Sequence, residues 1–210
     1  HLEQTFGIGC HTISVPRLEQ ASGSDCARHP PHPVSDSDFK KLIAILRLTI
    51  PYTGIIMSTR ETAHMRRETF ELGVSQISAG SCTRPGGYSN ADKPNDSSQF
   101  ALGDHRSLDA VINDVANLGY IPSFCTACYR TGRTGHDFMD LAKPGDIKHF
   151  CEPNALASFA EYLHDYATPE TRSIGETALN QVLGTMNKKD THQASRMIAQ
   201  VKSGKRDVFI

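Results

Sequence analysis

Three cysteines carry the clearest chemical signal in the sequence. Cys125 and Cys128 form a C-x-x-C pair, and Cys151 follows after twenty-two intervening residues. Two thiolates with this spacing can bind one metal centre without strain, and a third from a distant turn can complete the site. A structural zinc site usually has four protein ligands, whereas an iron–sulfur cube held by three cysteines leaves one iron open to an outside ligand. The three-cysteine set therefore points to chemistry at a cluster.

The spacing alone is also compatible with other kinds of cysteine site. His136 or His149 could complete a zinc site, and the C-x-x-C pair could instead be a redox pair or two buried thiols. Residues 129–135 contain two arginines and two glycines. They favour a cluster, because guanidinium and backbone N–H groups stabilise an anion. The cysteines without partner spacing are not assigned to the site: Cys10, Cys26 and Cys82.

Composition limits the class of protein. The chain has 210 residues, a formal net charge of −1 and 38% hydrophobic residues, which fits one domain or a domain with an appendage. This charge gives no electrostatic case for a nucleic-acid or membrane partner, and no apolar run approaches the roughly 18 residues of a membrane span. Six cysteines are too few for a disulfide scaffold and suit a reducing compartment. Because the sequence opens on His1 and not on methionine, we expect the C-terminal part of a longer protein.

The first third of the chain alternates between strand and helix patterns. Buried strands are predicted near residues 12–15, 54–58 and 74–79, with helices over about 35–50 and 61–72 between them. This alternation predicts parallel strands, whose carboxyl ends carry the active site in α/β folds. The polar residues at the carboxyl ends of the three strands include Arg17, Arg60 and Ser78.

Two of the polar residues near the strands have simpler interpretations as well. A guanidinium at Arg60 could bind a carboxylate with two hydrogen bonds, but it could also form a surface ion pair with Glu61. His11 precedes the first strand, and a single histidine is more often structural or solvated than a ligand. Three strands are too few for a barrel. If the chain belongs to a (β/α)₈ enzyme, it holds only about the last third of the barrel. On that interpretation the predicted fold class is α/β: the last strands and helices of a (β/α)₈ TIM barrel, followed by a mostly helical C-terminal domain.

Several segments together resemble the tyrosine-lyase branch of the radical S-adenosylmethionine enzymes, specifically its members that mature [FeFe]-hydrogenases. The matching stretches are residues 11–17, 51–54, 58–61, 76–81, 125–135 and 204–209. The C-x₂-C-x₂₂-C element is the most specific of them, because the related tyrosine lyase of the thiamine pathway lacks this second cluster site. The resemblance implies an incomplete barrel over residues 1–103 and a helical auxiliary-cluster domain over residues 104–210.

The resemblance implies an activity for the full enzyme. A 5′-deoxyadenosyl radical, made from S-adenosylmethionine, cleaves the Cα–Cβ bond of L-tyrosine to give p-cresol and dehydroglycine. Dehydroglycine breaks down to carbon monoxide and cyanide, which are assembled with iron as an Fe(CO)(CN) synthon on an auxiliary [4Fe–4S] cluster. A hydrogenase maturation scaffold protein is the implied partner. The implied location is the cytoplasm, or the matrix of an organelle such as the hydrogenosome in a eukaryote.

The resemblance also implies roles for individual residues. Arg60 would hold the tyrosine carboxylate, Ser78 its amino group, and Arg17 would line the S-adenosylmethionine site. His11 would bind an additional iron at the open corner of the auxiliary cluster. The cluster itself would be held by Cys125, Cys128 and Cys151.

One family motif is absent from this sequence. The C-x₃-C-x₂-C motif binds the [4Fe–4S] cluster that cleaves S-adenosylmethionine, and it does not occur in these 210 residues. We expect that motif and its cluster in an N-terminal half of the barrel, so this chain could not generate the radical by itself. The alternative is a stand-alone metal-binding or scaffold module without radical chemistry.

Overall fold

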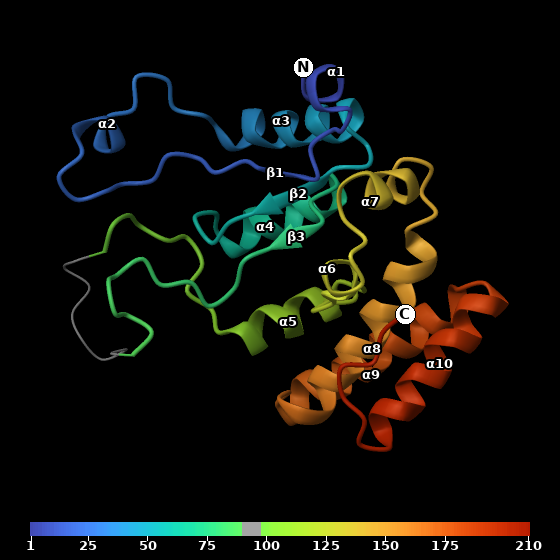
Figure 1. Cartoon of the computed structure of the whole chain (residues 1–210). Coiled ribbons are helices and arrows are strands. Elements are labelled where there is room, and N and C mark those ends of the chain that lie inside the picture. Colours follow the sequence, from blue (N-terminus) through green and yellow to red (C-terminus); the bar gives the residue numbers. More distant parts are fainter. Residues whose placement is uncertain (90–97) are drawn as a thin grey trace. The chain divides into compact units, whose positions relative to one another are not determined.

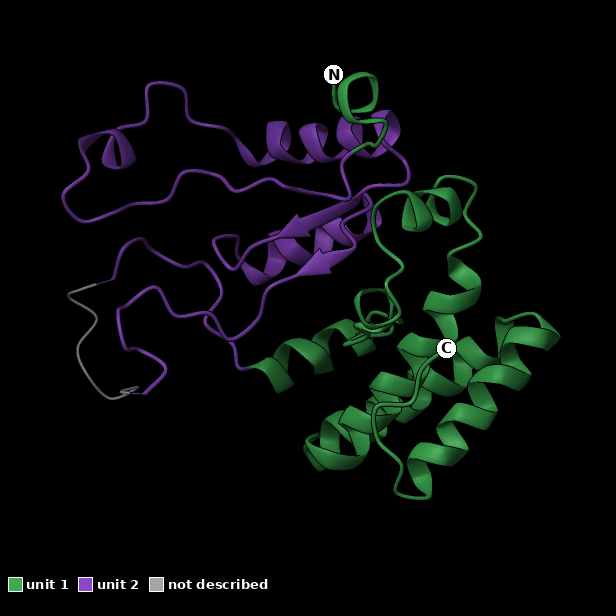
Figure 2. Cartoon of the chain, in the orientation of Figure 1, with its two compact units in different colours: residues 1–9, 108–210 green, residues 10–107 purple. Residues whose placement is uncertain are grey.

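The computed structural model describes residues 1–89 and 98–210, which divide into two compact units (Figures 1 and 2). The sheet unit comprises residues 10–107. The helical unit comprises residues 108–210 together with residues 1–9. The assignment of residues 1–103 to a barrel and 104–210 to an auxiliary-cluster domain stays a prediction.

The sheet unit contains a small parallel sheet with the strand order β1-β2-β3. Ile13 lies opposite Ile55, and Met57 lies opposite Ile77, in two parallel pairings. The predicted parallel arrangement is confirmed, although the strands are shorter than expected. The strands and helices of this unit are β1 (Thr12–Ser14), α2 (Asp25–Arg28), α3 (Asp36–Thr49), β2 (Gly54–Met57), α4 (Ala63–Glu71) and β3 (Gln76–Ile77).

The core of the sheet unit lies between the central strand β2 and the helices α3 and α4. Ile55 and Met57 of β2 are buried, and they join a cluster with the fully buried Phe39 and Ile43 of α3. Helix α3 begins where predicted, because Ser35 Oγ accepts a hydrogen bond from the Asp38 N–H group at 3.1 Å. The prediction that β1 is buried was wrong. This strand is half-buried because, among the described residues, it pairs on one side only, with β2.

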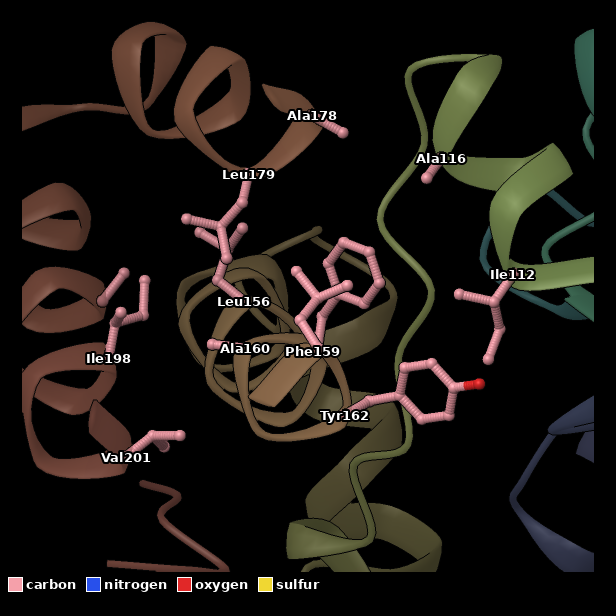
Figure 3. Packing of buried hydrophobic residues seen from close by; sticks show 12 residues of the cluster. Ile112, Ala116, Leu156, Phe159, Ala160, Tyr162, Ala178, Leu179, Ile198 and Val201 are labelled. Carbon is pink, nitrogen blue, oxygen red and sulfur yellow. The ribbon is translucent and has the colours of Figure 1, made fainter. Parts of the chain in front are cut away.

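The helical unit is organised around its longest helix, α8, which packs against α9 and α10. Figure 3 looks nearly along α8, with Ile198 and Val201 of α10 on one side and Ile112 of α5 on the other. Phe159 of α8 has no exposed surface. No helix of the described residues has the length and apolar character needed to cross a membrane. The helices of this unit are α1 (Leu2–Phe6), α5 (Leu108–Asn117), α6 (Ala127–Arg130), α7 (Gly135–Ala142), α8 (Lys148–Asp165), α9 (Pro169–Thr185) and α10 (Lys188–Lys202).

A single carboxylate ties three helices of this unit together. Asp109 of α5 accepts hydrogen bonds from Tyr162 Oη of α8 at 2.9 Å and from the hydroxyl groups of Thr168 and Thr171 at 2.8 Å each. Thr168 is the N-cap residue of α9. Burial raises the pKa of Asp109, but the three hydroxyl groups outweigh burial and hold its pKa below the usual value. This clamp fixes the Tyr162 ring, against which the cysteine loop packs.

Candidate functional site

The loop that carries the C-x-x-C pair is anchored to helix α8. The Phe124 ring stacks on the Tyr162 ring with 5.3 Å between centroids and an interplanar angle of 22°. The Phe124 N–H group donates to Ser158 Oγ at 3.2 Å. Tyr162 and Ser158 both belong to α8, and Cys151 lies in the first turn of the same helix. The loop before Cys125 and the distant third cysteine therefore share one rigid support.

The three cysteines interact with one another. All of them are free thiols; Cys125 and Cys151 are exposed, and Cys128 is half-buried. Although Cys151 keeps exposed surface, the protein atoms packed around its sulfur partly desolvate the thiol and raise its pKa to about 11, and the nearby Cys128 and Cys125 add to the effect. Cys125 Sγ accepts a hydrogen bond from the Ala127 N–H group at 3.4 Å. Cys125 and Cys128 are thus close enough to Cys151 for their charges to act on its thiol.

The two arginines of the loop make different contacts. Arg133 Nη1 donates to Cys128 Sγ at 3.8 Å, and its guanidinium lies 4.1 Å from the centroid of the Phe150 ring. Arg130 instead forms an ion pair with Asp207 and lies over the Phe209 ring. Arg133 therefore links both parts of the cysteine set, whereas Arg130 holds the tail of the chain.

The donor atoms around the three thiols can be compared with what a metal ion or a cluster requires. Among the described residues, no group of three or more His, Cys, Asp or Glu side chains is arranged to hold one metal ion. The cysteines of a cube bind three different irons, and so they stand further apart than the ligands of one ion. His149, a possible fourth zinc ligand, contacts Asp190 Oδ2 of α10 at 2.7 Å through its Nδ1 atom. Three thiols, an N–H group bound to sulfur and a nearby guanidinium fit an anionic cluster.

A second group of candidate residues lies at the carboxyl edge of the sheet. Arg17 Nε donates to Glu61 Oε1 at 2.9 Å, and its Nη2 atom pairs with the other carboxylate oxygen of Glu61. Arg17 also pairs with Asp36 at 2.6 Å. The hydrogen bond that Arg17 donates to Glu61 is the main cause that raises the pKa of Arg17. Glu61 is 2% exposed and the Arg17 side chain is 20% exposed, so this pair is a partly buried ion pair between the segments after β1 and β2.

Arg60 is held close to Arg17 by a different set of contacts. Its Nη1 atom donates to the Arg17 carbonyl oxygen at 3.2 Å, and its guanidinium lies 4.1 Å from the centroid of the Phe100 ring. The alternative that Arg60 forms an ion pair with Glu61 was wrong, because Glu61 binds Arg17. The stack on Phe100 fixes the plane of the Arg60 guanidinium, as two-pronged binding of a carboxylate requires.

Sequence patterns did not reveal the buried charge network that supports this edge. Arg66, 2% exposed, pairs through Nη1 with Asp104 and donates through Nη2 to the Ser78 carbonyl oxygen. Arg106 binds both oxygens of Asp104, at 2.9 and 2.7 Å. The network therefore positions the backbone at Ser78. Asp104 lies 38 residues from Arg66, and no local motif marks that pairing.

A glutamate that the sequence did not single out also lies at this edge. Burial raises the pKa of Glu19, and the charge of Glu61 adds to the rise, while Arg17 and Arg60 oppose it. A cavity of about 470 Å³ lies in the same unit. Its lining includes Ser81, Phe100 and His105. The cavity wall therefore shares Phe100 with the Arg60 stack.

His11 lies at the opposite edge of the sheet. It is the residue before β1, and its carbonyl oxygen accepts a hydrogen bond from the Gly54 N–H group at 3.1 Å, at the start of β2. Because the strands are parallel, the amino edge carries His11 and the carboxyl edge carries Arg17, Arg60 and Ser78. The structure thus separates the candidate iron ligand from the candidate substrate residues.

Comparison with known proteins shows a matching domain family and two related enzymes. Residues 14–121 match the family described as the Biotin and Thiamin Synthesis associated domain. The 2-iminoacetate synthase of Escherichia coli (strain K12) is 30% identical over 121 residues, which are 58% of this chain and 31% of that protein. The 2-iminoacetate synthase of Salmonella typhimurium is 31% identical over 115 residues, which are 53% of this chain and 28% of that protein.

Solved structures extend the likeness to the whole chain. The crystal structure of HydG, a maturase of the [FeFe]-hydrogenase, is 45% identical with a TM-score of 0.92, covering all of this chain and 45% of that one. HydG from Carboxydothermus hydrogenoformans is 41% identical with a TM-score of 0.71, covering 94% of this chain and 41% of that one. The chain therefore spans less than half the length of these relatives. It belongs to the Biotin and Thiamin Synthesis associated domain family, and its sequence and structure match the C-terminal part of the HydG maturase.

Proposed function

We propose that this chain is the C-terminal portion of a radical S-adenosylmethionine L-tyrosine lyase that serves [FeFe]-hydrogenase maturation. The observation that carries the proposal is the set of three interacting thiols, with Arg133 on Cys128, in a chain 45% identical to a HydG maturase. The thiolates of Cys125, Cys128 and Cys151 would hold an auxiliary [4Fe–4S] cluster. That cluster would supply an open iron site at which carbon monoxide, cyanide and an additional iron are brought together.

The two edges of the sheet would have different roles, substrate binding at one and iron binding at the other. At the carboxyl edge, Arg60 would bind the tyrosine carboxylate and Ser78 the amino group. Arg17, held by Glu61 and Asp36, would line the S-adenosylmethionine site with a fixed positive charge. At the amino edge, the imidazole of His11 would bind the additional iron. The iron product would pass to a hydrogenase maturation scaffold protein.

Anaerobic reconstitution with iron and sulfide tests the cluster assignment. We expect about four irons and four sulfides per set of these three cysteines, with an EPR signal after reduction. One zinc per chain and no bound sulfide would contradict the assignment. Reconstitution of the full-length protein would separate the proposal from a scaffold module, because a full enzyme carries a second cluster on a C-x₃-C-x₂-C motif outside these 210 residues and a stand-alone module does not.

Replacing Arg60 with alanine in the full-length enzyme is expected to weaken tyrosine binding. Hydrogen bonds between charged groups contribute roughly 1.5–3 kcal/mol, which corresponds to about a 10- to 100-fold rise in KM. Steady-state p-cresol formation measures this effect. Arg60→Lys keeps the charge but loses the pair of N–H donors that can bind both carboxylate oxygens, and so it should recover only part of the binding. An unchanged KM in Arg60→Ala would remove Arg60 from the substrate site.

A further inference from the structure

We propose that Arg133 is a positioning residue of the auxiliary cluster site, which sets the reduction potential of the cluster through the Cys128 sulfur. This inference rests on the proposed function, because it requires a cluster on the three cysteines. It goes further by assigning different tasks to the two arginines of the loop.

The contacts of Arg133 place a fixed positive charge at the site. Its Nη1 atom lies 3.8 Å from Cys128 Sγ, within hydrogen-bond range for sulfur. The guanidinium also stacks on a second residue, Phe150, whose ring centroid lies 4.1 Å from it. Phe150 is the residue before Cys151, so the guanidinium lies between the C-x-x-C loop and the start of α8. The positive charge of Arg133 also acts on Cys151.

The backbone around Arg133 supports this position. The Arg133 N–H group donates to the Cys128 carbonyl oxygen at 2.8 Å, which closes the turn after α6. Gly132 within this turn has φ +73°, a left-handed conformation that a side chain would strain. The turn therefore directs the Arg133 side chain back toward the cysteine that its own backbone contacts.

Arg130 is excluded from this task by its own partners. It lies three residues earlier in the same loop, but its guanidinium pairs with Asp207 and lies 4.6 Å from the centroid of the Phe209 ring. Both contacts belong to the tail after α10. Arg130 is thus a matched control, because it has the same charge and loop but a different neighbour.

The expected consequence follows from charge. Reduction adds one electron to a cluster that is already anionic because of its three thiolates. A cation and an N–H donor at a ligand sulfur stabilise the more negative state, and so they raise the reduction potential. Removing the Arg133 charge should therefore make the cluster harder to reduce.

Potentiometric titration of the reconstituted protein with dithionite, followed by EPR, tests this inference. The auxiliary signal is first assigned by its loss in Cys125→Ser. Relative to wild type, Arg133→Gln should shift the midpoint to a more negative potential by about 60 mV or more, a tenfold change in the one-electron equilibrium. Arg133→Lys should shift it less, and Arg130→Gln should leave it at the wild-type value.

The outcomes separate the two claims. A wild-type potential in Arg133→Gln, with iron and sulfide retained, overturns the role of Arg133 and leaves the cluster site intact. Equal shifts in Arg133→Gln and Arg130→Gln overturn it too, because they would show a general effect of loop charge. If Arg133→Gln does not hold a cluster, the midpoint potentials of Arg133→Lys and Phe150→Leu are measured instead. Wild-type potentials in both variants overturn the role of Arg133. Absence of iron from the wild-type site overturns the proposed function and this inference together.

Discussion

Replacing Cys128 with serine is expected to reduce the iron at the auxiliary site from about four atoms to nearly none. Cys128 lies in α6, and its sulfur accepts a hydrogen bond from Arg133. A serine hydroxyl is a harder ligand that ionises far less readily than a thiol, and so it does not replace a thiolate on iron. The two remaining cysteines would leave a second iron without a protein ligand.

Iron, sulfide and EPR analyses of parallel reconstitutions measure this loss. Cys26→Ser is the matched control, because Cys26 is an exposed free thiol in the sheet unit. It should keep the full iron content at the auxiliary site. Retention of a four-iron cluster in Cys128→Ser, or an equal loss in Cys26→Ser, would contradict the ligand assignment.

Replacing Asp104 with alanine is expected to destabilise the sheet unit by about 3–5 kcal/mol, the usual cost of breaking a buried charge pair. Asp104 and Arg66 are 4% and 2% exposed, and they form an ion pair that Arg106 extends. The substitution leaves the Arg66 guanidinium buried without its carboxylate. Urea unfolding at neutral pH measures the change, and the exposed Asp140→Ala should shift stability by less than about 0.5 kcal/mol.

The contribution of Asp104 should also depend on pH. Burial raises the pKa of Asp104, but hydrogen bonds from Arg106 and the charge of Arg66 outweigh burial and lower it to about 2. Because this pKa is depressed in the folded state, the stabilisation is complete above the unfolded pKa of 3.8 and is lost as pH falls toward 2. The stability difference between wild type and Asp104→Ala should therefore shrink below pH 4. A difference that stays constant to pH 2 would show that Asp104 does not act through its charge.

Local patterns in the sequence predicted the arrangement of the sheet unit. Short apolar runs separated by a capped helix are local signals, and the parallel pairing of Ile13 with Ile55 follows from the connecting helix α3. The same patterns overestimated strand length and burial. These properties depend on neighbouring strands, and the described residues give β1 a neighbour on one side only.

Contacts between residues far apart in the sequence could not be predicted from local patterns. The C-x-x-C spacing is local, so Cys125 and Cys128 could be recognised as a pair. Arg130 and Arg133 look equivalent in sequence, because the difference between them arises from Asp207 and Phe150, which fold back from other segments. The resemblance supplied Arg60 and Ser78 as candidates, but not the Phe100 ring or the Arg66 network that hold them in place.

The first nine residues have a consequence for how the chain folds as it is synthesised. They belong to the helical unit, where Glu3 of α1 pairs with Lys143 at 2.8 Å across 140 positions of sequence. During synthesis this ion pair can form only after the entire sheet unit, α5 and α7 have been made, because Lys143 directly follows α7. The helical unit therefore joins residues that are translated at widely separated times, with a whole second unit made between them.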